Sequence, residues 1–239
     1  MSIAFVPARR ALAVLLLILP VAFWSVAAHA GSLDALSSRE ASGGLRAALG
    51  RGIDQAVAHL GVPGGFLSNP KVRIPLPPAL RKIDRGLRLV GMGGDADALD
   101  VAMNHAAESA VADAKPILEQ ALRHMTIDDA KGILTGGDDS VTQYFRRTTG
   151  DSLRRKFEPI VATATARVRL ATLYDQYAGN AARFGLVKAD DAHLNDYVTR
   201  KALDGLFSAI ADEERAIRRD PLHQGSSLIK RVFGALNNQ

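Results

Sequence analysis

The sequence predicts an all-α fold: a single domain of about eight to ten amphipathic helices, interrupted by one extended loop. Three observations support this fold class. Alanine and leucine are frequent beyond residue 30, and apolar residues recur there at intervals of three and four, which is the period of amphipathic helices. Runs of alternating or β-branched residues, which would indicate strands, are almost absent. Proline and glycine are concentrated in residues 62–78, and we expect this segment to be the extended loop.

Residues 1–30 have the features of a signal peptide. Arg9 and Arg10 precede an apolar run of about a dozen residues, which is short for a membrane span. Ala28 and Ala30 then have the spacing of a cleavage site, so we expect cleavage after Ala30. An uncleaved membrane anchor is the alternative interpretation. Cleavage predicts an exported protein, with the periplasm as its first expected location and secretion or membrane association as alternatives.

The expected mature chain, residues 31–239, is long enough for the core of one helical domain. Two of the 30 Lys and Arg residues precede the cleavage site and none of the 25 acidic residues do, which leaves a net charge of +3. This mild charge argues against a nucleic-acid partner. The absence of cysteine excludes disulfide bonds and cysteine-bound zinc. No later stretch reaches 18 consecutive apolar residues, so we expect no transmembrane segment in the mature chain.

Stripes of apolar residues predict the helices of the first half of this domain. Ser37 and Glu40 have the spacing of a capping box at the start of the first helix. Pro78 suits the first turn of the second helix, and Thr126 with Asp129 has capping-box spacing at the fifth. The expected inner residues of the first four helices are, in order, Leu45, Leu49, Ile53, Val57 and Leu60; Leu80, Ile83, Leu87 and Val90; Leu99, Met103, Ala106 and Ala110; and Ile117, Ala121, Leu122 and Met125.

The second half of the domain contains three further long stripes. Pro159 lies within the first of them and is expected to kink or split that helix. The longest helix is predicted over residues 196–218, with the charged segment DEERAIRR as its solvated end. A last helix is predicted after Ser226 or Ser227. The expected inner residues of the three long helices are Leu153, Phe157, Ile160, Ala164 and Val168; Leu173, Tyr177 and Ala181; and Leu203, Leu206, Phe207 and Ile210.

The loop at residues 62–78 is too apolar to be a free linker. Its apolar side chains are those of Phe66, Leu67, Val72, Ile74 and Leu76. Long irregular loops are uncommon in compact domains and are often functional. We expect this loop to lie across the helices and seal the core, with a peptide-binding edge beside residues 72–74 as the alternative.

Several long segments of the chain are similar to one bacterial family. They are GGFLSNPKVRIPLP, AKGILTGGDDSVTQYFRRTT, AARFGL, LNDYVTRKALDGLF and EERAIRRDP. With these segments the chain resembles the family called domain of unknown function 4197, from about Leu36 to Leu236. The resemblance implies an exported all-helical domain with no assigned activity, and so no catalytic residues to carry over. Some members of that family look lipid-anchored, whereas this chain lacks the cysteine that such an anchor requires.

The stretch ILTGGDDSVTQYFRR, residues 133–147, has the composition of a binding site and also that of a junction between two helices. In the structural interpretation, Gly136 and Gly137 take positive φ values and end one helix. Asp138 or Asp139 then caps the next helix, where a negative charge is favourable. A phosphate-binding loop is not expected, because the glycine-rich turn is short and no lysine stands behind it.

The same stretch supports a second interpretation, a site for a cation or a polar ligand. Its ligand-binding residues would be Asp138, Asp139, Tyr144 and Arg146. In the structural interpretation, by contrast, Tyr144 packs into the core and Arg146 points to solvent. Because one helix needs only one cap, the second aspartate is the residue that favours a ligand site.

Other groups of polar residues give weaker signals. His105 and Glu108 lie three residues apart on a helix, but a zinc site requires three or four ligands, and we predict no metal and no cofactor. The basic cluster at residues 154–156 could meet an anionic membrane surface, although interleaved acidic residues favour ordinary surface charge. Glu213 and Glu214 diverge on a helix and are expected to be solvated or to cap a helix.

The sequence contains no complete catalytic set. It has no HExxH zinc motif and no GxSxG nucleophile turn, and an all-helical fold is a poor host for the latter. We therefore expect a non-enzymatic envelope protein that binds a protein partner or a small ligand, and no catalytic residue. The alternative is an enzyme, such as a hydrolase, with a site near Asp138 and Asp139.

Overall fold

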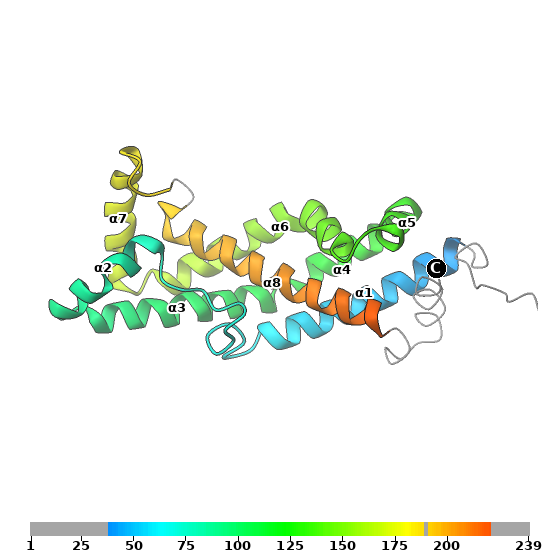
Figure 1. Ribbon diagram of the computed structural model, residues 1–239, viewed down its shortest axis with the longest axis horizontal. Helices are drawn as coiled ribbons and strands as arrows, with labels where there is room; N and C mark the ends of the chain where they lie inside the picture. The colour runs from blue at the N-terminus through cyan, green and yellow to red at the C-terminus, as the bar shows by residue number, and fades with distance from the viewer. Residues whose placement is uncertain (1–37, 189–190, 221–239) are drawn as a thin grey trace, which may run out of the picture. The chain divides into compact units, whose positions relative to one another are not determined.

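The computed structural model describes residues 38–188 and 191–220, with side chains from Ala41 onward, all within the unit Gly31–Gln239. These residues form eight α-helices and no strand, so the all-α prediction is confirmed (Figure 1). The helices are α1 (Ser38–Leu60), α2 (Pro78–Leu89), α3 (Gly93–Ala112), α4 (Lys115–His124), α5 (Ile127–Thr135), α6 (Ser140–Thr165), α7 (Arg169–Arg183) and α8 (Leu194–Arg219). The predicted signal peptide, the Ser37–Glu40 capping box and the last predicted helix lie outside the described residues.

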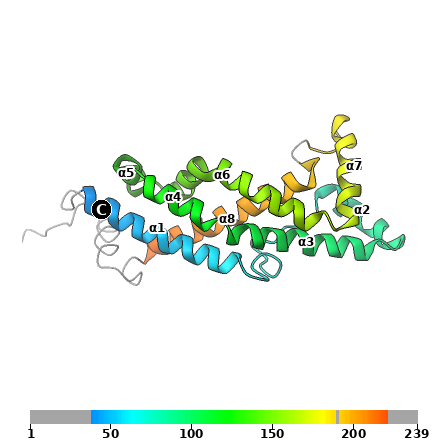
Figure 2. The same cartoon turned by 180° about the vertical axis from the view of Figure 1, so that it is seen from behind.

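Three long helices form the centre of the core. α6 packs against both α3 and α8, α1 lies along α8, and α4 and α5 each pack on α1 and α6. Met103 of α3, Phe157 of α6 and Leu206 of α8 are fully buried in this interior. In two opposite views, α2 and α7 lie at the same end of α3, away from α5 (Figure 1, Figure 2). α2 and α7 both pack on α3, and α7 also contacts α8.

Most helix signals in the sequence coincide with the structure. α8 begins two residues before the predicted range and ends one residue after it. Thr126 and Asp129 form the predicted capping box, with the Asp129 N–H donating to Thr126 Oγ1 at 3.0 Å. α6, however, is not split at Pro159. Pro159 lies on the exposed side of α6, where water can satisfy the carbonyl left without a donor, while Phe157 anchors the buried side.

The inner faces predicted for α2 and α7 are partly wrong. Leu80 of α2 is buried, but Ile83 is 53 % exposed and Val90, just past the helix end, is exposed as well. On α7 the predicted inner residue Tyr177 is exposed. The buried residues of α7 are instead Leu170, Ala171, Tyr174 and Ala178. Apolar residues cover more than one face of each helix, so spacing alone does not select the face that packs on the core.

The loop between α1 and α2 seals the core, as predicted. The side chains of Phe66 and Ile74 are buried in it. Phe66 packs directly on the backbone of α8, because a Cβ added to Gly205 would lie 2.6 Å from Phe66 Cε1. Residues 73–77 then run to the start of α2 without forming a strand.

Candidate functional site

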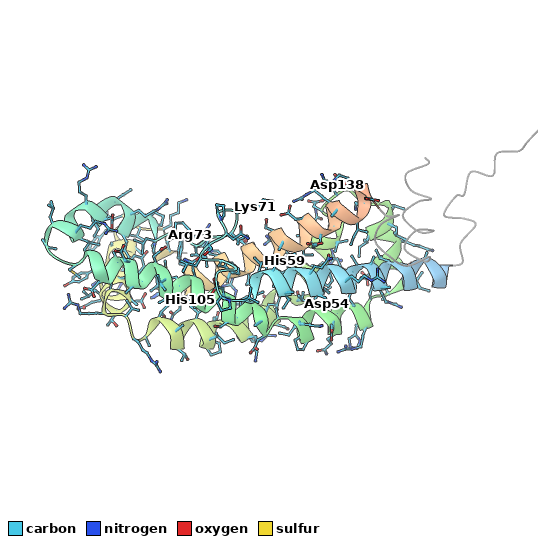
Figure 3. The ribbon with its side chains drawn as sticks, turned by 90° about the horizontal axis from the view of Figure 1, so that it is seen from below. Asp54, His59, Lys71, Arg73, His105 and Asp138 are labelled. Carbon is cyan, nitrogen blue, oxygen red and sulfur yellow. The ribbon has the colours of Figure 1, made fainter. Side chains whose placement is uncertain are left out.

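The two aspartates of the predicted ligand site are both exposed at the junction between α5 and α6. Asp139 occupies the N-cap position of α6, but among the described residues its side chain makes no capping hydrogen bond. Instead, Asp139 Oδ2 accepts a hydrogen bond from Gln143 Nε2 at 2.9 Å. Asp138 lies near the end of α8, far from His105 (Figure 3). The junction thus leaves both carboxylates facing water.

The other two residues of the predicted site make separate contacts. Tyr144 is buried, and its hydroxyl donates to the backbone carbonyl of Ala121 in α4 at 2.9 Å. Burial raises the pKa of the Tyr144 phenol. Arg146 stacks 4.7 Å above the ring of Phe207 and pairs with Asp204 of α8 at 3.3 Å. Tyr144 and Arg146 therefore share no contact partner with each other or with the aspartates, and a ligand site built from these four residues remains a prediction.

One glycine of this junction, Gly136, is needed for a different reason from the one predicted. Gly136 has a φ of −83° and does not take the left-handed conformation. A Cβ at Gly136 would lie only 2.7 Å from both the Gly132 carbonyl oxygen and Ser140 Cβ. Gly136 is thus required because two helices approach each other closely, and the prediction of positive φ at Gly136 and Gly137 is wrong.

The start of α6 is capped by Glu214, a residue that was expected either to be solvated or to cap a helix. Glu214 of α8 is 3 % exposed, and its two oxygens accept the N–H groups of Val141 and Thr142 at 3.2 and 3.3 Å. Arg218 Nη2 pairs with Glu214 at 2.9 Å and also donates to the carbonyl of Ile133, the residue that follows Gly132 in α5, at 2.9 Å. Burial raises the pKa of Glu214, and the N–H donors and Arg218 oppose that rise.

This buried pair corrects the prediction that DEERAIRR is a solvated end. Glu214 and Arg218 join α8 to the end of α5 and the start of α6, so the segment is a structural junction rather than a free surface. One sequence signal was available, because a glutamate four residues before an arginine favours an ion pair on one helix face. The partner helix was not visible in the sequence, since α6 begins 74 residues before Glu214.

A second buried carboxylate, Glu108 of α3, holds the loop between α1 and α2. Its Oε1 accepts the backbone N–H groups of Gly64, Phe66 and Leu67 at 3.0 to 3.1 Å. Its Oε2 lies 2.8 Å from His105 Nδ1. His105 and Glu108 do share a helix face, as predicted, but the carboxylate is fully engaged in anchoring the loop.

Asn104, one turn before Glu108, holds the next part of the same loop. Its Oδ1 accepts the N–H of Ile74 at 2.8 Å, and its Nδ2 donates to the carbonyl of Ile74 at 2.9 Å. Both backbone groups of Ile74 are therefore taken, and that position of the predicted peptide-binding edge is already paired with α3.

We expect the stabilising effect of Glu108 to depend on pH. Burial alone would raise the pKa of the Glu108 carboxyl, but the N–H groups of the loop and His105 together hold it below its ordinary value. A carboxyl whose pKa is lower in the folded state stabilises the fold above its unfolded pKa, about 4.3, and this contribution is lost as the pH falls through the folded value. Urea unfolding of the wild-type protein and of Glu108→Gln should therefore differ most near neutral pH. The difference should shrink below about pH 4, and a difference that stays constant with pH would contradict this account.

An apolar groove lies between α2 and α7 in the described part of the chain. It has a volume of about 340 Å³. α2 and the following turn contribute Ala79, Leu80, Ile83, Leu87 and Met92, and α7 and the following turn contribute Leu170, Leu173, Tyr174, Tyr177, Ala178, Ala181 and Val187. Apart from the two tyrosine hydroxyls, these side chains offer no hydrogen-bonding group, so a ligand would be held by apolar contact. The lining thus combines buried core residues of the two helices, such as Leu80 and Tyr174, with exposed apolar residues, such as Ile83 and Tyr177.

The groove has no group suited to acid–base or nucleophilic chemistry at neutral pH. The hydroxyl of Tyr174 donates to the backbone carbonyl of Asp191, and burial raises the pKa of this phenol to about 12. The groove therefore fits the binding of an apolar molecule better than its chemical conversion.

The described residues contain no group of three or more His, Cys, Asp or Glu side chains placed to hold a metal ion. None of their helices combines the length and the apolar composition that a bilayer span needs.

Comparisons with known proteins give a family and nothing more specific. A family model described as "Protein of unknown function (DUF4197)" matches residues 35–234. Neither a curated protein nor a solved structure matches the chain.

Proposed function

We propose that this chain, which belongs to the DUF4197 family of proteins of unknown function, is a non-enzymatic envelope protein that binds an apolar small molecule in the α2–α7 groove. The ligand class that fits is a linear acyl chain, because the groove runs between two helices and is lined almost wholly by aliphatic and aromatic side chains. The expected signal peptide supports export, and we propose the periplasm as the location.

The observation that carries this proposal is the apolar lining of a groove that stays open to solvent. Its volume falls in the range of small-molecule sites, about 300–1,000 Å³. Ile83 and Tyr177 line it yet remain more than half exposed, so a bound chain would remove them from water. At about 0.8 kcal/mol per buried methylene, eight methylenes contribute about 6 kcal/mol, which corresponds to a dissociation constant on the order of 10 µM before immobilisation costs.

The alternative function, hydrolysis near Asp138 and Asp139, has weaker support. Both aspartates are exposed, and Asp139 is hydrogen-bonded to Gln143 rather than aimed at a reacting group. We keep this function as a prediction, and the Asp138→Asn/Asp139→Asn variant below tests whether the junction takes part in ligand binding.

We expect a fluorescent fatty acid, cis-parinaric acid, to bind the protein purified after expression of the full chain. Ile83→Gln should weaken this binding about tenfold, because a polar side chain then lies in the apolar wall. Fluorescence titration measures both dissociation constants. Ile83 is exposed, so the substitution should leave the fold intact, which circular dichroism checks.

The matched control is Ile127→Gln on α5, since Ile127 is 45 % exposed and lies outside the groove. It should bind cis-parinaric acid as the wild-type protein does, and so should Asp138→Asn/Asp139→Asn. If the wild-type protein does not bind the probe, or if Ile83→Gln and Ile127→Gln behave alike, the groove is not the site. Loss of binding in the aspartate variant would instead favour the junction between α5 and α6.

A further inference from the structure

Exposed apolar side chains gather around the α2–α7 groove. Of the nine large apolar residues that are exposed in the described part of the chain, six belong to α2, α7 or the turns that follow them. Leu89 is 84 % and Phe184 80 % exposed, and Val90 and Leu186 are exposed beside them. Single exposed apolar residues are ordinary, but a concentration of this kind indicates an interaction surface.

These residues lie at or just beyond the ends of the two helices that form the groove. Leu89 and Val90 stand at the end of α2, and Phe184 and Leu186 follow α7. Arg169, at the start of α7, pairs at 3.2 Å with Asp95 in the first turn of α3, so the start of α7 lies beside the helix that follows α2. Exposed apolar residues thus continue from both helices of the groove.

Positive charge is concentrated on the same two segments. Residues 78–92 and 169–188 contain seven Lys and Arg residues against two Asp residues, a net charge of +5. The whole expected mature chain has a net charge of only +3, so the remainder of it is negative. Two acidic residues of α3 offset part of this charge, because Asp97 pairs with Arg88 and Asp95 with Arg169.

Five cations of these segments remain available. They are exposed and form no ion pair with another described residue: Arg81, Lys82, Arg85, Arg183 and Lys188. Arg85 follows Lys82 by three residues and precedes Leu89 by four, so these three side chains share a face of α2. Arg183 and Lys188 enclose Phe184 and Leu186 in the sequence RFGLVK. Exposed apolar and cationic side chains therefore alternate in both segments.

We propose that this face, α2 with the α7 end and its following turn, docks on the surface of an anionic bilayer. Lysine is depleted in the cores of protein–protein interfaces, whereas basic residues interleaved with Phe and Leu are typical of helices that lie in a membrane interface. The inference rests on the proposed function, because docking brings the open groove to the acyl chains that it would bind.

The end of the described chain lies away from this face. α8 begins beside α7, where the Leu194 N–H donates to Asp175 at 2.7 Å, and it ends beside α5, where Arg218 contacts Ile133. A helix of this length spans about 40 Å, so Asp220 is distant from the groove. The exposed face and the end of the described chain thus lie at opposite ends of α8.

Co-sedimentation with vesicles tests the proposal on protein purified after expression of the full chain. The wild-type protein should bind vesicles of phosphatidylglycerol mixed equally with phosphatidylcholine, should not bind pure phosphatidylcholine, and should be released by high salt. Lys82→Glu/Arg85→Glu should weaken binding by about 25-fold or more. Phe184→Ser/Leu186→Ser should weaken it as well, because the apolar contribution is lost.

The matched control is Arg154→Glu/Arg155→Glu on α6, which changes the net charge equally on another exposed helix face. It should bind the anionic vesicles nearly as the wild-type protein does. No vesicle binding, an equal loss in the control, or a dimer that buries Phe184 and Leu186, detected by light scattering, would overturn the proposal.

Titration with cis-parinaric acid separates this inference from the proposed function. Lys82→Glu/Arg85→Glu should still bind the fatty acid, because neither residue lines the groove. Fatty-acid binding without vesicle binding refutes the docking face alone. Vesicle binding without fatty-acid binding refutes the groove as a ligand site and leaves the docking face supported.

Discussion

Glu214→Ala should lower the free energy of unfolding by about 3–5 kcal/mol, the cost of breaking a buried ion pair. The substitution removes the Glu214 carboxylate from the guanidinium of Arg218, whose side chain is only 14 % exposed. It also removes the acceptor for the N–H groups of Val141 and Thr142 at the start of α6. Urea unfolding followed by circular dichroism at neutral pH measures the effect.

Two comparison variants make this prediction specific. Glu213→Ala, one residue away, removes a carboxylate that makes neither the α6 contacts nor the Arg218 pair and should cost about 1 kcal/mol or less. Glu214→Leu/Arg218→Met removes both charges of this pair and should be less destabilised than Glu214→Ala, since no guanidinium then stays there without the Glu214 carboxylate. Equal losses in Glu213→Ala and Glu214→Ala would show that Glu214 is not the cap of α6.

Asn104→Ala should lower the free energy of unfolding by about 3 kcal/mol. The substitution leaves both the N–H and the carbonyl of Ile74 without their partner, at about 1–3 kcal/mol for each buried group. The loop that carries Phe66 onto α8 would then be held mainly by Glu108. We also expect faster hydrogen exchange at the Ile74 amide, because its protecting acceptor is gone.

Asn69→Ala is the matched control within the same loop. Asn69 also accepts a backbone N–H through its side chain, that of Lys71 at 3.1 Å, but this contact is exposed to water. Water can replace it, so we expect a loss of about 1 kcal/mol or less. Equal destabilisation by Asn69→Ala and Asn104→Ala would contradict the anchoring role of Asn104.

The sequence was sufficient for the helices but not for the contacts between them. The period of three and four located α3, α6 and α8, and the Thr126–Asp129 capping box is local, so both could be predicted. The cap of α6 could not, because it is supplied by Glu214 from a distant helix. A charged residue that is buried by tertiary packing has the same local pattern as one that is solvated.

The candidate site was missed for a related physical reason. Spacing showed that Ile83 and Tyr177 are apolar positions on amphipathic helices, and the expectation that they face the core followed from that alone. Burial is decided by which helices meet: α2 and α7 pack on α3, and Ile83 and Tyr177 lie on the exposed side of the groove between them. The sequence instead predicted a ligand site at Asp138 and Asp139, because polar residues near glycines are the usual sequence signature of a site.

Amide hydrogen exchange of the protein with and without cis-parinaric acid tests the central claim most directly, namely that the α2–α7 groove is the ligand site. We expect the fatty acid to slow exchange in residues 78–92 and 169–187 and to leave residues 136–144 unchanged. Protection confined to residues 136–144, or no protection anywhere at a saturating concentration of the fatty acid, would contradict it.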